Sequence, residues 1–123
     1  MTTDLTISLA HHPGTLAAAC DALGRAGVNI EAASGHVVDD QPELHVLVAD
    51  AALATRTLID AGFEIRAQRQ VLALHVDNRA GAAARLLRGI KDADVSVDLV
   101  YTTLDGRLVL GANDLARLRE AIG

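Results

Sequence analysis

Residues 5–30 read LTISLAHHPGTLAAACDALGRAGVNI, and residues 72–97 repeat their pattern as LALHVDNRAGAAARLLRGIKDADVSV. The two stretches align without a gap, and both place a glycine between a strand-like and a helix-like segment. An internal repeat of this kind indicates two similar structural units in one chain. The matching positions are Leu5 and Leu72, Ile7 and Leu74, Leu9 and Val76, Gly14 and Gly81, Ala17 and Ala84, Leu23 and Ile90, Val28 and Val95, and Ile30 and Val97.

The spacing of apolar residues predicts the order of elements. Residues 4–10 alternate as a half-buried strand does, and residues 15–26 carry an apolar stripe at helical spacing. Gly27 suits the left-handed residue that ends a helix. The further elements that we expect are strands over 28–37 and 43–49 joined by a polar hairpin, a helix over 51–61 between the N-cap Asp50 and Gly62, a strand over 63–70 that runs on to Val76, a helix over 81–92, strands over 95–102 and 107–112 joined at Asp105-Gly106, and a helix over 114–122 with Asp114 as its N-cap.

This order predicts an α+β fold of two tandem βαββαβ units with antiparallel sheets, over residues 1–70 and 71–123. The second unit lacks its last strand. Because natural proteins cover or pair exposed sheet edges, we expect the segment 63–76 to be shared between the units, or a second chain to complete the sheet. A homodimer would supply that second chain.

Composition excludes several classes of function. The chain has 11 basic and 16 acidic residues, and it contains one Phe, one Tyr and no Trp. Nucleic-acid binding usually needs a basic patch or stacking aromatic side chains, so we expect no nucleic-acid partner. The sequence has no apolar run long enough to span a membrane, and its first residues lead us to expect no secretory signal. The single Cys20, which we read as a small core residue, fits a cytoplasmic protein.

The turn after the first strand is the most informative candidate site. Gly14 has no Cβ, so a ligand can approach the backbone there, and Pro13 fixes its own φ. The N–H groups from Thr15 onward open a helix, where a carboxylate binds well. An amino acid also needs an acceptor for its ammonium group, and we expect Asn29 to lie close to the turn in that role.

Residues 11–30, HHPGTLAAACDALGRAGVNI, resemble the signature of the ACT domain family: a Pro-Gly turn, an apolar helix, a Gly, and an Asn-Ile pair opening the second strand. The resemblance implies a ferredoxin-like fold and amino-acid binding at interfaces between paired units. In the second copy Ala80 replaces the Pro, and Ser96-Val97 replaces Asn-Ile. The ligand-binding residues expected are His11, Pro13, Gly14, Thr15, Leu16, Asn29 and Ile30 in the first unit, and Asn78, Gly81 and Ser96 in the second.

Other polar residues have structural readings. The histidines lack the spacing of metal ligands and no Cys accompanies them, so we expect no metal and no cofactor. Arg85 and Arg88 are most simply a solvent-facing side of the third helix, with anion contact as the alternative. Asp39-Asp40 is read as a solvated hairpin tip.

Together these observations predict a non-catalytic regulatory protein that binds an amino acid, forms a homodimer and acts on an unknown regulated protein. Two alternatives stay open. One is a small enzyme on the same scaffold, for which His11, His75 and Asp77 are the acid–base candidates. The other is a dimerisation or scaffold module in which side chains fill the former ligand clefts.

Overall fold

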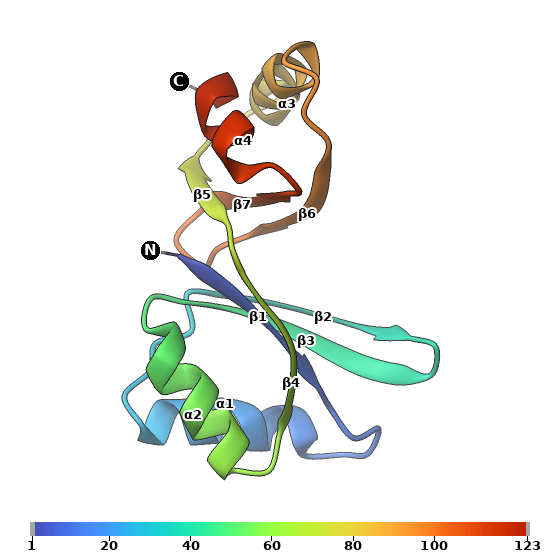
Figure 1. The fold of residues 1–123 in the computed structure, drawn as a ribbon, viewed down its shortest axis with the longest axis vertical. Coiled ribbons are helices and arrows are strands. Elements are labelled where there is room, and N and C mark those ends of the chain that lie inside the picture. Colours follow the sequence, from blue (N-terminus) through green and yellow to red (C-terminus); the bar gives the residue numbers. More distant parts are fainter. Residues whose placement is uncertain (1, 123) are drawn as a thin grey trace. The chain divides into compact units, whose positions relative to one another are not determined.

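The computed structural model describes residues 2–122. The chain divides into two compact units, Met1–Arg69 and Gln70–Gly123. Each unit combines one sheet with two helices (Figure 1).

The first unit has a four-stranded sheet with the strand order β2-β3-β1-β4. Strand β3 pairs antiparallel with both of its neighbours, and the two helices lie together on one face of the sheet (Figure 1). This is the ferredoxin-like βαββαβ arrangement expected from the sequence, which is thereby confirmed. Its elements are β1 (Thr3–Ser8), α1 (Thr15–Arg25), β2 (Ala32–Val38), β3 (Gln41–Val48), α2 (Ala51–Asp60) and β4 (Glu64–Gln70).

The core of the first unit lies between that sheet and its helices. Alternation along β1 buries Leu5 and Ile7 completely, as the period of two in a strand requires. The apolar stripe of α1 brings Leu23 onto the sheet, and Leu58 does the same from α2. The buried members of this cluster are Leu5, Ile7, Leu9, Ala19, Leu23, Val28, Leu44, Val46, Val48, Ala54 and Leu58.

Strand β2 begins later than the apolar pattern predicts. After Gly27, whose φ is 78°, the amide of Val28 donates to the carbonyl of Leu23. This closes the helix with the hydrogen bond typical of a glycine-terminated end. Sheet pairing starts only where the amide of Glu31 donates to Leu47. The segment 28–31 therefore belongs to the connection, and the expected start of this strand at residue 28 is wrong.

The β2–β3 hairpin turns through two aspartates in left-handed backbone conformations. Val38 pairs with Gln41, and between them Asp39 and Asp40 have φ values of 49° and 63°. A two-residue hairpin loop with positive φ at both positions strongly favours Asn or Gly. The strands continue right up to this turn, so the loop is shorter than expected.

Replacing Asp40 with glycine should stabilise the protein by about 0.5–1 kcal/mol, because glycine adopts this conformation without steric cost. The His11–Asp40 contact that is lost spans 4.0 Å between exposed side chains, and such pairs contribute little. Urea unfolding measures the change. Glycine already occupies a left-handed position in the other hairpin, at Gly106, so Gly106→Asp should change stability in the opposite direction.

Two of the helices begin with an aspartate cap, as predicted. The Asp50 carboxylate accepts a hydrogen bond from the amide of Leu53 at 3.0 Å. Asp114 does the same for Arg117 at 3.1 Å. A carboxylate at this position satisfies an amide that the helix leaves unpaired.

The second unit has a three-stranded sheet with the order β5-β7-β6, and β7 pairs antiparallel with both neighbours. Beside β5, where the first unit has β4 beside β1, the described residues place no further strand. The expected segment 63–76 is divided at Val71, so that β4 belongs to the first sheet and β5 to the second. The elements are β5 (Leu72–His75), α3 (Ala82–Asp92), β6 (Val97–Thr102), β7 (Arg107–Ala112) and α4 (Leu115–Ile122).

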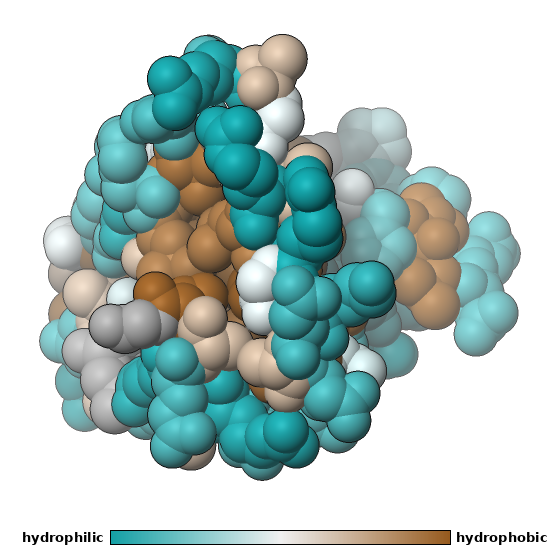
Figure 2. Space-filling view, turned by 90° about the horizontal axis from the view of Figure 1, so that it is seen from above, coloured by the Kyte–Doolittle hydropathy of each residue, from teal (hydrophilic) through white to brown (hydrophobic). Residues whose placement is uncertain are grey.

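The core of the second unit is less completely covered than that of the first. Its buried residues are Ile90, Leu110, Ala112 and Leu118, and more of its apolar residues are only partly buried. Apolar side chains gather in a hollow surrounded by hydrophilic ones (Figure 2). Among the described residues, no helix has the length and hydropathy that crossing a membrane requires.

Candidate ligand-binding site

The turn between β1 and α1 is braced by its own hydrogen bonds. Gly14 takes a left-handed conformation, with φ 94° and ψ −10°, directly before the helix. The hydroxyl of Thr15 donates to the carbonyls of Ala10 and His12, at 2.9 and 3.2 Å. Thr15 thus holds the turn in shape, and its hydroxyl proton is already used within the chain.

Helix α1 differs from α2 and α4 at its start. Its N-cap residue is Gly14, and no side chain caps it. Helix α3, which follows Gly81 in the second unit, is likewise without a side-chain cap. The first-turn amides of such a helix remain available to an anion from outside.

A cleft of about 620 Å³ opens beside the uncapped start of α1. This lies within the range of small-molecule sites. The cleft runs along residues 33–37 of the edge strand β2, and apolar side chains form much of its wall. Its lining residues are Leu9, Ala10, His11, His12, Thr15, Leu16, Cys20, Ala33, Ser34, Gly35, His36, Val37, Pro42, Glu43 and Leu44.

Glu43 is the only carboxylate among the residues that line this cleft. Its side chain is 18 % exposed, and its Oε1 accepts a hydrogen bond from Nη1 of Arg66 on β4 at 3.3 Å. The sequence pattern does not single out Glu43 as a site residue. Its place depends on the pairing of Ser8 with Glu43 and of Glu43 with His36, which local patterns do not reveal.

A buried acid–base pair crosses the same sheet. Nδ1 of His45 lies 3.0 Å from Oδ2 of the fully buried Asp4. A carboxylate only accepts hydrogen bonds, so Nδ1 carries the proton and donates it. The hydrogen bond to Asp4 is the main reason that the pKa of His45 is raised, with burial opposing it.

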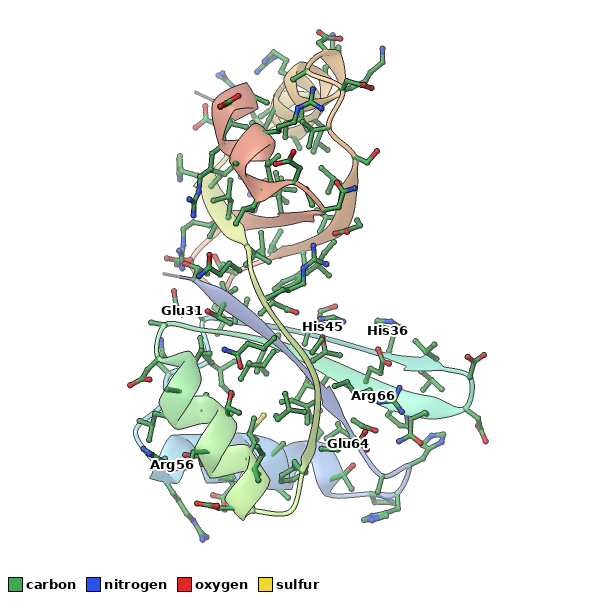
Figure 3. The ribbon with its side chains drawn as sticks, viewed as in Figure 1. Glu31, His36, His45, Arg56, Glu64 and Arg66 are labelled. Carbon is green, nitrogen blue, oxygen red and sulfur yellow. The ribbon has the colours of Figure 1, made fainter. Side chains whose placement is uncertain are left out.

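His36 links this pair to the cleft. Its ring stacks on that of His45, with centroids 6.0 Å apart and planes 8° from parallel. Figure 3 shows the two side chains projecting from β2 and β3 on the face opposite α1 and α2. His36 also lines the cleft, so the imidazole of His45 lies one aromatic ring away from it.

The structure brings together only some of the residues predicted for the first site. His11, Thr15 and Leu16 line the cleft, while Pro13 and Gly14 form the turn beside it. The other two predicted residues, Asn29 and Ile30, follow the far end of α1.

Asn29 does not lie close to the turn within one chain, and that expectation is wrong. Helix α1 spans 11 residues, or about 16 Å at its usual rise, and it separates Gly14 from Asn29. Ile30 packs against the core of the first unit. Asn29 is exposed.

The second turn has a cleft of its own, of about 410 Å³. Asn78 lines it together with Arg79 and Arg107. Gly81 is left-handed, with φ 85°, and stands at the start of α3. Ser96 is exposed and precedes β6; it is not among the residues that line this cleft.

The acid–base candidates for an enzyme are exposed. Nε2 of His75 lies 3.6 Å from Oδ1 of Asp77, with side chains 81 % and 59 % exposed. His11 lies 4.0 Å from Asp40 at the hairpin tip. Solvent screens such pairs, whereas a catalytic pair is usually held in a desolvated pocket.

Within residues 2–122 no group of three or more His, Cys, Asp or Glu side chains could hold a metal ion. Cys20 is a free, half-buried thiol that lines the first cleft.

No family model and no curated protein matches this sequence. Solved structures share its fold. Protein BT0572 from Bacteroides thetaiotaomicron has a TM-score of 0.87 at 21 % identity, over 98 % of this chain and 85 % of that one. The ligand-free regulatory subunit of aspartate kinase from Thermus thermophilus has a TM-score of 0.73 at 14 % identity, over 98 % of this chain and 89 % of that one. The regulatory subunit of aspartate kinase from Thermus flavus has a TM-score of 0.66 at 13 % identity, over 98 % of this chain and 90 % of that one.

At these identities the likeness establishes the fold, and function has to be argued from the site. The resemblance to ACT-domain proteins is confirmed at this level. The chain consists of two ferredoxin-like units in tandem, the second of them shorter.

Proposed function

We propose that this chain is a non-catalytic regulatory protein that binds an amino acid with a small apolar side chain in the cleft of its first unit. One observation carries the proposal: the uncapped start of α1 opens onto an apolar cleft that contains a single carboxylate. The similarity in fold to the regulatory subunit of aspartate kinase supports a regulatory role.

The cleft supplies a partner for each part of such a ligand. The ligand carboxylate is placed at the first-turn amides of α1, where the helix dipole favours negative charge. The ammonium group is placed at Glu43. The apolar side chain is placed against Leu16, Val37 and Leu44, which line the same cleft. Leu16 and Val37 are 54 % and 53 % exposed, so a ligand that covers them removes apolar surface from water.

The test is a thermal-shift screen of the purified chain against the twenty amino acids. A ligand present at a hundred times its dissociation constant adds about 2.7 kcal/mol to stability. We expect valine, leucine or isoleucine to raise the melting temperature, and charged amino acids to have no effect. The absence of a shift with every amino acid would contradict the proposal.

A pair of glutamate variants locates the site. Glu43→Gln should weaken binding at least tenfold, because a hydrogen bond between charged groups contributes about 1.5–3 kcal/mol. Glu64→Gln is the matched control: Glu64 is exposed on β4 and lies outside the lining of the cleft (Figure 3). Calorimetric titration should give the wild-type affinity for this control. Equal losses in both variants would remove Glu43 from the site.

The proposal includes a homodimer. Strand β5 is an edge of its sheet within the described residues, and the core beside it is only partly covered. A strand from a second copy would pair with this edge and cover that core. Asn29 can then reach a ligand only from the partner copy, because α1 separates it from the turn of its own chain. Light scattering measures the oligomeric state, and loss of binding in a dimeric Asn29→Ala variant would support a shared site.

A further inference from the structure

The clefts of the two units occupy equivalent positions but differ in charge. In the gapless repeat, His12 corresponds to Arg79 and Ala18 to Arg85. Strand pairing extends the comparison, because Ser8 lies opposite Glu43 while its counterpart His75 lies opposite Arg107. Arginine has thus replaced three different residues around the second turn, within a chain whose formal net charge is −5.

The three arginines face one continuous depression. The second cleft, of about 410 Å³, adjoins a smaller one of about 310 Å³, and both are lined by Val76, Asp77 and Arg79. Arg107 lines the larger cleft and Arg85 the smaller. Nη1 of Arg85 lies 3.7 Å from the place that a Cβ on Gly81 would occupy, so its guanidinium covers the turn itself.

The carboxylates nearby are shared unevenly among these basic side chains. Asp77 lies 3.6 Å from Arg79 and also 3.6 Å from His75. Asp105 accepts two hydrogen bonds from Nε of Arg107. Among the described residues, Arg85 has no ion-pair partner. Asp77 is therefore shared between two basic side chains, and Arg85 is left without a carboxylate of its own.

These ion pairs add little to the stability of the fold. The Arg79 and Asp77 side chains are 67 % and 59 % exposed, and exposed pairs contribute little to stability. The guanidinium group of an arginine can donate two parallel hydrogen bonds to a carboxylate or a phosphate. An external anion that displaced Asp77 from Arg79 would therefore do so at small cost, in clefts that Arg85 and Arg107 also line.

We propose that the cleft of the second unit binds a small anion with at least two negative charges, a dicarboxylate or a phosphate, and that it is a site separate from the apolar cleft of the first unit. The first cleft has no arginine in its lining. The two units then respond to chemically different ligands. This inference goes beyond the proposed function and does not depend on it.

Calorimetric titration with inorganic phosphate and with succinate tests the site, against sodium chloride at matched ionic strength. We expect saturable binding of one of the two anions and none of chloride. Preference for phosphate would identify a phosphate site, and preference for succinate a dicarboxylate site. Failure of both anions to bind, or an equal response to chloride, would overturn the proposal.

Variants on a single helix provide the control. Arg85→Gln should weaken anion binding at least tenfold, while Arg88→Gln, three residues further along α3 and outside both clefts, should keep the wild-type affinity. Both side chains are exposed, so both variants should fold, and circular dichroism checks this. Equal losses in the two variants would show that only the general charge of the chain matters. If an amino acid still raises the melting temperature of Arg85→Gln, the anion site is distinct from the amino-acid site of the first unit.

Discussion

Replacing His45 with leucine is expected to lower the free energy of unfolding by about 2–3 kcal/mol at pH 6, because it removes a charged partner of a buried carboxylate. Asp4 is fully buried, and the side chain of His45 is 14 % exposed. Removing one member of a fully buried ion pair costs about 3–5 kcal/mol, and the partial exposure of His45 reduces this figure. Urea unfolding of both proteins measures the difference.

The difference should depend on pH in a defined direction. The hydrogen bond to Asp4 raises the pKa of His45, the charges of Asp4 and Glu43 add to it, and burial and Arg69 oppose it. In the folded protein the pKa of His45 therefore lies above its ordinary value of 6.5. The stabilisation by charged His45 is complete below the pKa that His45 has in the unfolded chain. It is lost as the pH rises through the higher pKa that His45 has in the folded protein.

The gap in the free energy of unfolding between wild type and His45→Leu should accordingly narrow between pH 6 and pH 9. His75→Leu is the control, since His75 and its partner Asp77 are both exposed, and it should change stability by less than about 0.5 kcal/mol. A gap that stays constant from pH 6 to pH 9 would show that the imidazole stabilises the sheet by packing and not by its charge.

Replacing Gly14 with valine should both destabilise the protein and abolish binding in the first cleft. The φ of 94° at Gly14 lies in the left-handed region, which costs other residues about 1–2 kcal/mol and β-branched residues more. A Cβ at this position would meet nothing within 4 Å, so the cost arises from the backbone alone. Relief of this strain moves the turn, and the first-turn amides of α1 turn away from the cleft.

Two matched variants separate the causes. Asparagine tolerates the left-handed conformation, so Gly14→Asn should keep most of the stability and the ligand-induced thermal shift. Gly81→Val introduces the same strain in the second unit, at φ 85°, and should leave amino-acid binding intact. If Gly14→Val still binds an amino acid with wild-type affinity, the ligand does not use the amides of this turn.

Much of the fold can be predicted from the sequence, because the relevant signals are local. The strands and helices follow from apolar residues spaced two or three to four positions apart. Asp50 and Asp114 were identified as caps because a cap contacts an amide only three residues away. The repeat places Gly14 and Gly81 at equivalent turns, and in the structure both adopt a left-handed conformation.

The composition of the candidate sites was decided by the tertiary structure. Asp4 and His45 are 41 positions apart in the sequence and meet only through the register of β1 with β3. The β1–β3 register also places Glu43 in the first cleft, and the register of β5 with β7 places Arg107 in the second. Asn29 is the opposite case. The family motif places it at the ligand site, but the length of α1 separates it from the Gly14 turn of its own chain. Local periodicity determines which element a residue joins, whereas strand register and helix length determine which distant residues it meets, and in this chain those distant contacts set the charge of each cleft.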